Sequence, residues 1–265
     1  MMAFKAFVAK EWLEICRNLK IIWLPVALML LGVMQPVMMY FLPQIIEKTS
    51  GIENGEALIA LFEQQTSVEI FSQTLSSQFD QLGIMIILIS GISLISADRQ
   101  SGMLSFILTK PVSLAHYLSA KVVVQFGLIF VSLLAGYFLA AYYSVLLFGD
   151  LPLAAVGQAF FIYSIWIFFL FTLLLFLSTI LESGTVAGIL AIVSGILLTT
   201  LTGLEAAGQI FNPAYLSKAA VSLIQNEQLV DYFWPNLFVT LLISIALLIG
   251  SFFLVSWRPL SRQSK

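Results

Sequence analysis

Side chains able to perform covalent chemistry are few in this sequence of 265 residues. No Gly is followed by a Lys, so the chain lacks the G-x-x-x-x-G-K-S/T loop and cannot bind ATP in that way. The one His, His116, excludes paired-histidine metal motifs and His-based nucleophile dyads, and we expect it at the lipid headgroup interface. The one Cys, Cys16, excludes an internal disulfide and has no neighbour that would activate it. We therefore expect no catalysis, no metal and no cofactor bound by this chain.

Composition places the chain in a lipid bilayer. Hydrophobic residues make up 60% of it and charged residues 10%, and its mean hydropathy is +1.01. This is more apolar surface than one water-soluble core could bury. The formal net charge of -2 gives no reason to expect a nucleic acid partner. We predict a multi-pass protein of the cell (plasma) membrane, with the lipid bilayer as its surroundings.

The apolar runs predict an all-α integral membrane protein with six transmembrane helices. The membrane domain covers 21–257, with spans expected at about 21–42, 81–97, 122–148, 157–181, 184–204 and 234–257. The other segments are an external helical segment at 43–80, a cytoplasmic segment at 98–121, an external segment at 205–233 and a cytoplasmic tail at 258–265. Pro25 and Pro36 should bend the first span, which should end before Pro43.

Residues 1–20 are expected to form an amphipathic helix ahead of the first span. Its apolar residues share one stripe: Phe4, Phe7, Val8, Trp12, Ile15 and Leu19. A basic helix with aromatic residues on its apolar side suits the plane of the lipid headgroups. The alternative is a soluble helix that packs on a partner.

Positive charge predicts the orientation. With both termini in the cytoplasm, ten of the twelve Lys and Arg residues are cytoplasmic, and only Lys48 and Lys218 lie outside. Positive residues collect on the side from which a membrane protein is inserted. The segment 98–121 is therefore also predicted to be cytoplasmic, where a soluble partner could reach it.

The segment from Asp98 to Lys121 is longer than a turn between two spans requires. Leu104, Ile107 and Leu108 form an i, i+3, i+4 apolar cluster, and Pro111 would stop the helix that carries them. The pattern predicts a short amphipathic helix outside the bilayer.

This segment resembles the cytoplasmic coupling segment of the type 2 ATP-binding-cassette permease family. The positions that carry the resemblance are Asp98, Arg99, Gly102, Leu104, Leu108, Pro111, Val112, Ser113 and Lys121. The chain departs from the usual pattern at Asp98, where family members commonly have Glu, and at Met103, where they have Thr.

The resemblance implies a permease subunit, by analogy an exporter, that pairs with a second permease copy or a similar chain. Two separate ATPase subunits would bind ATP and Mg. The helix from Leu104 to Leu108 would ride in a cleft on one of them, with Asp98 and Arg99 anchoring the segment. Gly102 would let the backbone approach closely, and Pro111 would redirect the chain into the third span.

Small and weakly polar residues follow helical spacing inside the spans. Gly184 and Gly188 form a G-x-x-x-G pair that predicts close helix packing. Ser90 and Ser93 in the second span, and Thr199, Thr200 and Thr202 in the fifth, are open to two interpretations. They pack within one subunit, or, as the resemblance implies, they line a substrate path or the interface with the second subunit.

In the segment 205–233, Asn212-Pro213 is a helix-start signal, and Tyr215, Ala219, Leu223 and Leu229 form an apolar pattern. The resemblance implies a re-entrant or surface helix here, and an ordinary amphipathic loop is the alternative.

The six expected spans contain no Asp, Glu, Lys or Arg. Carriers driven by protons or sodium generally need such a group within the bilayer, so we do not expect one here. Glu182, between the fourth and fifth spans, should cap the fifth helix. The alternative to a permease is a nucleotide-independent membrane anchor or immunity-type interaction protein. The substrate cannot be read from these patterns.

Overall fold

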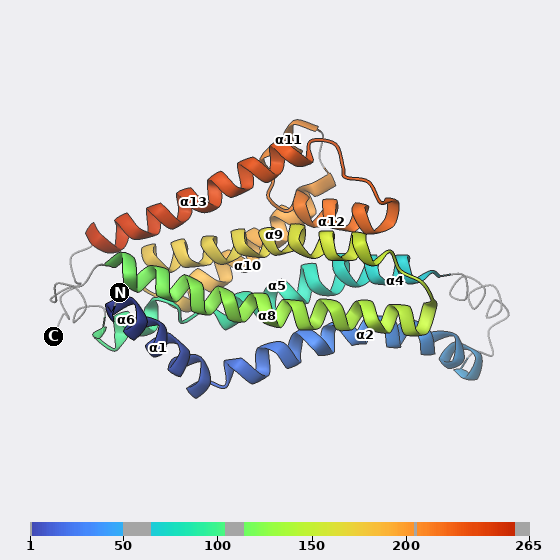
Figure 1. Cartoon of the computed structure of the whole chain (residues 1–265), viewed down its shortest axis with the longest axis horizontal. Helices are drawn as coiled ribbons and strands as arrows, with labels where there is room; N and C mark the ends of the chain where they lie inside the picture. The colour runs from blue at the N-terminus through green and yellow to red at the C-terminus, as the bar shows by residue number, and fades with distance from the viewer. Residues whose placement is uncertain (1, 50–64, 104–113, 204–205, 258–265) are drawn as a thin grey trace.

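The computed structural model describes residues 2–49, 65–103, 114–203 and 206–257, and every regular element in these ranges is a helix (Figure 1). The elements in chain order are α1 (Met2–Arg17), α2 (Lys20–Thr49), α4 (Ser67–Gln73), the π-helix η1 (Thr74–Gly83), α5 (Ile84–Ser90), α6 (Ser96–Gln100), α8 (Leu114–Phe148), α9 (Leu153–Ile180), α10 (Gly184–Thr200), the 3-10 turn η2 (Leu201–Gly203), α11 (Ala206–Phe211), α12 (Tyr215–Asn226) and α13 (Phe233–Trp257). Helix α1 and the last turn of α13 lie at the same end of the bundle (Figure 1).

Helix α9 forms the centre of the bundle. It packs against α10, α12 and α13, and it buries Tyr163, Trp166 and Phe171 almost completely. A helix that is apolar all round must be covered by protein or lipid on every side. On the other side of the bundle α8 packs along α2 and, near its first turns, along α1.

Two glycines let α2 and α8 cross with their backbones in contact. A β-carbon on Gly136 would lie 2.6 Å from the carbonyl oxygen of Leu28, and one on Gly32 would meet the carbonyl oxygen of Gly136. Apolar side chains gain little by associating within lipid, so close backbone packing of this kind holds membrane helices together.

Five helices in the described ranges are long and apolar enough to cross a membrane. They are Lys20–Ile46, Leu114–Phe148, Leu153–Ile180, Gly184–Gly203 and Phe233–Val255. The first expected span, 21–42, is shorter than the helix observed, because α2 continues through Pro43 to Thr49. Helices α8 and α9 begin earlier than the third and fourth expected spans. The bounds of the fifth and sixth expected spans agree closely with those of α10–η2 and α13.

The expected second span at 81–97 is wrong in its bounds. Helix begins at Ser67 and continues through α4, η1 and α5 to Ser90, and a turn then separates it from α6. Thr66 starts the run, because its side chain and that of Glu69 form a capping box. The polar residues of 67–80 suggested an external segment, yet several, including Thr74 and Asp80, are buried against other helices. Residues 50–64 of the expected external segment lie outside the described ranges.

The segment after α10 folds back into the bundle. Helix α12 packs against α9, α4 and η1, with Tyr215, Ala219 and Leu223 buried as the pattern indicates, whereas Leu229 is exposed. The fully buried Asn236 donates from Nδ2 to the carbonyl oxygens of Gln209, Ile210 and Asn212 at 2.7, 3.3 and 2.8 Å, which ties this segment to the start of α13.

The turn between α9 and α10 corrects another expectation. Ser183, and not Glu182, is the N-cap of α10, since its side chain accepts a hydrogen bond from the amide of Val186. Serine is among the residues best suited to this position.

We predict that Gly136→Ala destabilises the protein by about 1–3 kcal/mol, because the added methyl group would push α2 away from α8. Gly127→Ala in the same helix is the matched control, since a β-carbon there meets nothing within 4 Å. The measurement is the thermal unfolding of both variants in detergent or nanodiscs. Equal melting temperatures for the two would contradict close packing at this crossing.

Candidate functional site

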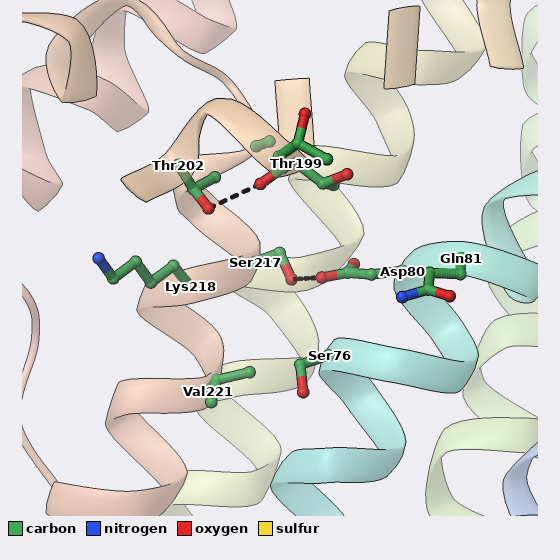
Figure 2. Close-up of a pocket in the computed structure, with 10 residues that line it drawn as sticks. Ser76, Asp80, Gln81, Thr199, Thr202, Ser217, Lys218 and Val221 are labelled. Carbon is green, nitrogen blue, oxygen red and sulfur yellow. Dashed lines mark hydrogen bonds between the residues drawn. The ribbon is translucent and has the colours of Figure 1, made fainter. Parts of the chain in front are cut away.

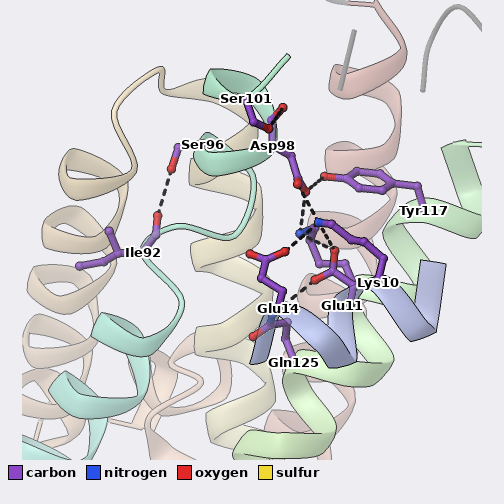
Figure 3. A network of polar contacts seen from close by, with 10 residues as sticks. Lys10, Glu11, Glu14, Ile92, Ser96, Asp98, Ser101, Tyr117 and Gln125 are labelled. Carbon is purple, nitrogen blue, oxygen red and sulfur yellow. Dashed lines mark hydrogen bonds and ion pairs between the residues drawn. The ribbon is translucent and has the colours of Figure 1, made fainter. Parts of the chain in front are cut away.

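Five charged side chains meet where α1, α6 and the first turns of α8 come together (Figure 3). We refer to this set as the ionic cluster: Lys10, Glu11, Glu14, Asp98 and Lys121. The cluster lies at the end of the bundle that also holds the end of α13 (Figure 1). Its side chains come from three helices, so it joins segments that are far apart in the chain.

The two lysines share the three carboxylates. Lys10 Nζ lies 2.7 Å from Asp98 Oδ1, 2.8 Å from Glu14 Oε2 and 2.9 Å from Glu11 Oε1. Lys121 Nζ lies 2.9 Å from Glu11 Oε1 and 2.8 Å from Asp98 Oδ2. Both lysines therefore bridge α1 to α6.

Two neutral side chains complete the hydrogen bonding around these carboxylates. The Tyr117 hydroxyl donates to Asp98 Oδ2 at 2.6 Å, and Gln125 Nε2 donates to Glu11 Oε2 at 3.3 Å. Both come from α8, one turn before and one turn after Lys121.

The ionic cluster is shielded from solvent, so each of its buried charges needs a partner of opposite charge. The side chains of Lys121 and Glu11 are each 1% exposed, and that of Asp98 is 5% exposed. Moving such charges out of water costs several kcal/mol for each ion, so a buried pair adds little net stability, but losing one partner is expensive. The cluster therefore fixes how α1, α6 and α8 fit together.

The pKa values of two cluster residues reflect this pairing. Burial alone would raise the pKa of Asp98, but the nearby charge of Lys121 and the contacts with Lys10 and Tyr117 hold it below its ordinary value. Burial alone would lower the pKa of Lys10, and the contacts with Asp98, Glu14 and Glu11 raise it above its ordinary value instead. Both groups remain charged at neutral pH.

Arg99, next to Asp98, joins α6 to a further helix. Its Nη1 donates to the carbonyl oxygen of Leu181 at 3.0 Å and its Nη2 to that of Thr179 at 3.1 Å. These carbonyls belong to the C-terminal end of α9, where backbone acceptors lack partners within the helix and a cation is favoured.

Gly102 follows α6 with a left-handed backbone, φ 71°. This conformation is easy only for glycine, and a β-carbon here would meet nothing within 4 Å among the described residues. Met103 is partly buried against the core. The expected coupling residues Leu104, Leu108 and Pro111 lie outside the described ranges.

The apolar stripe expected on α1 is only partly correct. Phe7, Val8 and Ile15 pack against the core, but Trp12 and Leu19 are exposed. Glu11 takes the buried position instead, because it pairs with Lys121 of α8. Glu11 lies four residues after Phe7 and four before Ile15, and this spacing places it on the buried face of α1. Its charge alone would instead predict an exposed position.

The glycines and serines expected in the spans lie apart from the expected threonines. A β-carbon on Gly184 would collide with the carbonyl oxygen of Ile92 and the side chain of Ser96, and one on Gly188 would meet Ile92, so both pack within this chain. Ser90 is buried, and its hydroxyl donates to the carbonyl oxygen of Ile87 at 2.6 Å. Ser93 lies in the turn after α5.

Thr199, Thr200 and Thr202 line a polar cavity of about 280 Å³ between η1, α12 and the end of α10 (Figure 2). The remaining lining residues are Ser76, Asp80, Gln81, Ala214, Ser217, Lys218 and Val221. No sequence pattern connects Asp80 with the threonines, because Asp80 belongs to the expected external segment and more than 100 residues of chain separate them. Neither Ser90 nor Ser93 lines this cavity.

Comparison with known proteins gives two matches. The family described as "ABC-2 family transporter protein" matches residues 6–250. The uncharacterized transmembrane protein YxlG of Bacillus subtilis (strain 168) is 31% identical over 246 residues, which cover 92% of this chain and 94% of that protein. No solved structure matches the chain.

We predict that Lys121→Met destabilises the protein by about 3–5 kcal/mol, because it leaves Glu11 and Asp98 buried with one cation fewer. Lys5→Met is the matched control, since Lys5 is an exposed lysine of the same helix pair. The measurement is thermal unfolding in nanodiscs. A Lys121→Met protein as stable as Lys5→Met would show that the cluster does not hold these helices.

Acid should weaken the cluster. The pKa of Asp98 is lower in the folded chain than in the unfolded chain, so its stabilising effect is complete above the ordinary pKa of the carboxyl group and is lost as the pH falls through the folded pKa. We expect the melting temperature to fall between about pH 5 and about pH 2, and to fall less steeply in Asp98→Asn. Asp150→Asn, which removes an exposed carboxylate, should keep the wild-type profile. Identical profiles for wild type and Asp98→Asn would contradict this account.

Proposed function

The chain belongs to the ABC-2 family of transporter proteins, and we propose that it is the transmembrane permease subunit of an ATP-driven exporter. ATP hydrolysis would take place on separate ATPase subunits, which bind ATP and Mg. The permease would act as a pair of identical or similar chains. This chain would contribute no catalytic residue.

The observation that carries the proposal is how firmly the chain is anchored just before the segment 104–113. Asp98 joins α6 to α1 and α8 through Lys10 and Lys121, and Arg99 joins α6 to the end of α9. A force applied to the chain after Gly102 would therefore reach α1, α8 and α9 together. An ATPase that bound there could move the bundle, whereas a loose loop would absorb the motion.

In this proposal the helical run 67–90 and the turn that follows form the second of six crossings. Together with the five long helices, this gives an even number of crossings, which agrees with α1 and the end of α13 lying at one end of the bundle. The excess of positive residues supports a cytoplasmic, plasma-membrane orientation for that end. The exposed Trp12 and Leu13 on α1 would lie among the headgroups.

The backbone conformation of Gly102 also supports docking at this point. Its left-handed backbone turns the chain after α6, and no side chain of the described ranges fills the volume beside it.

We predict that Leu104→Asp or Leu108→Asp releases the ATPase subunit, because each places a charge on the apolar face that would dock in the ATPase cleft. The measurements are co-purification of an ATPase subunit co-expressed with this chain and the stimulated ATP hydrolysis of that subunit. Ser119→Asp adds the same charge to an exposed position of α8 at the same end of the bundle and should change neither.

Unchanged co-purification and unchanged hydrolysis in both leucine variants would contradict the proposal. A wild-type chain that functions with no ATPase would support the nucleotide-independent anchor instead.

A further inference from the structure

The helical run from Ser67 to Ser90 changes its hydrogen-bond register inside η1. At the start of η1, the amide of Thr74 donates to the carbonyl oxygen of Ile70, four residues earlier, as in an α-helix. At the end of η1, the amide of Ile84 donates to the carbonyl oxygen of Phe79, five residues earlier, as well as to a nearer one. A π-helical turn encloses one more residue than an α-helical turn, so η1 holds a surplus of about one residue.

Two serine hydroxyls lower the cost of this change of register. Ser76 donates to the carbonyl oxygen of Ser72 at 3.0 Å, and Ser77 donates to that of Gln73 at 2.6 Å. Each acceptor lies four residues earlier, where an α-helix would use the backbone amide of the same serine. The hydroxyl keeps the carbonyl oxygen paired while the amide turns to another acceptor.

Both ends of the run are held to other parts of the bundle. At one end the Ser67 hydroxyl donates to the carbonyl oxygen of Asp150, in the connection between α8 and α9. At the other end the turn at 91–95 is closely packed, because a β-carbon on Gly91 would lie 2.6 Å from Leu174 Cδ2. Movement of one end relative to the other would therefore be taken up in η1.

The register of η1 decides which of its side chains face the neighbouring helices. Gln78 Nε2 donates to Gln35 Oε1 of α2 at 3.2 Å. The Ser217 hydroxyl of α12 donates to Asp80 Oδ2 (Figure 2). A shift of one residue along an α-helix turns a side chain by about 100° and moves it by about 1.5 Å along the axis. Such a shift would break both contacts.

The π-helical register leaves some buried polar atoms of the run unpaired. Among the described residues, the Ser72 hydroxyl has no hydrogen-bond partner, and neither has Gln78 Oε1. Ser72 is 1% exposed, so water does not replace the missing partner from the surface. Buried polar atoms nearly always have a partner. The π-helical register therefore does not satisfy the run completely, which allows another register to compete with it.

We propose that η1 is a register switch. Residues 74–83 change between the π-helical register and an α-helical register, and the change moves Gln78 away from α2 and Asp80 away from α12. It also reshapes the wall of the polar cavity, because Ser76, Asp80 and Gln81 line that wall. Helix α6 ends the same run, so a pull on α6 reaches η1. That an ATPase supplies the pull rests on the proposed function, whereas the existence of two registers does not.

The experiment removes the surplus residue from η1. Deletion of Ser77 leaves a run that a regular α-helix spans with both ends and both side-chain contacts in place. Deletion of Ile86 from the regular helix α5 is the matched control, since it would turn the rest of that helix by about 100°. Each full-length chain is studied alone in lipid nanodiscs, by thermal unfolding and by hydrogen–deuterium exchange of its backbone amides.

We expect the wild-type amides of 75–84 to exchange at least about tenfold faster than those of α9, relative to their intrinsic rates, because each change of register releases them. Deletion of Ser77 should slow this exchange to within a few-fold of α9 and change the melting temperature by less than about 5 °C. Deletion of Ile86 should lower the melting temperature by more than about 10 °C.

A Ser77 deletion as unstable as the Ile86 deletion would show that η1 holds no surplus residue, and would overturn the proposal. Wild-type exchange at 75–84 as slow as in α9 would show a single fixed register. Faster exchange after deletion of Ser77 would show fraying of the helix, and either of these results also overturns the proposal. An ATPase that fails to co-purify with the chain would overturn the permease function and leave the register switch standing.

Discussion

The arrangement of the chain depends on charges that are buried where α1, α6 and α8 meet. Lys121 is enclosed near the start of α8, and Glu11 and Asp98 lie within 2.9 Å of its Nζ. Removing one partner would strand the others in a medium of low dielectric constant, so the three helices are held in one relative position. Apolar side chains gain little by associating within lipid, so the paired charges add a register that hydrophobic burial alone does not supply. We infer that the chain keeps these charges for the rigidity they impose on one end of the bundle.

The ionic cluster and the polar cavity both take a carboxylate from the same irregular helical run. The path from Ser67 to Gln100 includes the π-helical stretch η1, which carries Asp80, the turn at 91–95, and α6, which carries Asp98. Hydrogen bonds in such irregular helical stretches have poorer geometry than in a regular α-helix, and these stretches often mark functional positions. Gly184 and Gly188 allow α10 to pack against the turn at Ile92, so the helix whose end lines the polar cavity also contacts the segment that leads to the ionic cluster. The polar cavity and the segment before residues 104–113 therefore lie on one continuous piece of chain.

The sequence predicted much of the helical framework because lipid imposes a simple demand. A backbone within the bilayer must satisfy its own hydrogen bonds, so long apolar runs become helices, and the bounds of α10 and α13 agree closely with expectation. The polar run from Ser67 to Asp80 was misjudged, since polarity alone cannot distinguish exposure to water from burial against other polar groups. Glu11 and Asp80 were missed for a related reason. Their partners, Lys121 and Ser217, lie far away in the chain and become neighbours only when the bundle assembles.

The most direct test of the central claim is whether α1 and α8 move as one body when the ATPase works. Spin labels at Lys5 and Ser119, both exposed, with Cys16 replaced by Ser, would report the distance between the two helices in the reconstituted complex. The account predicts the same distance distribution with and without ATP, since Lys121 and Lys10 keep the helices joined while they move together. A separation of α1 from α8 by several ångströms on ATP binding would contradict it.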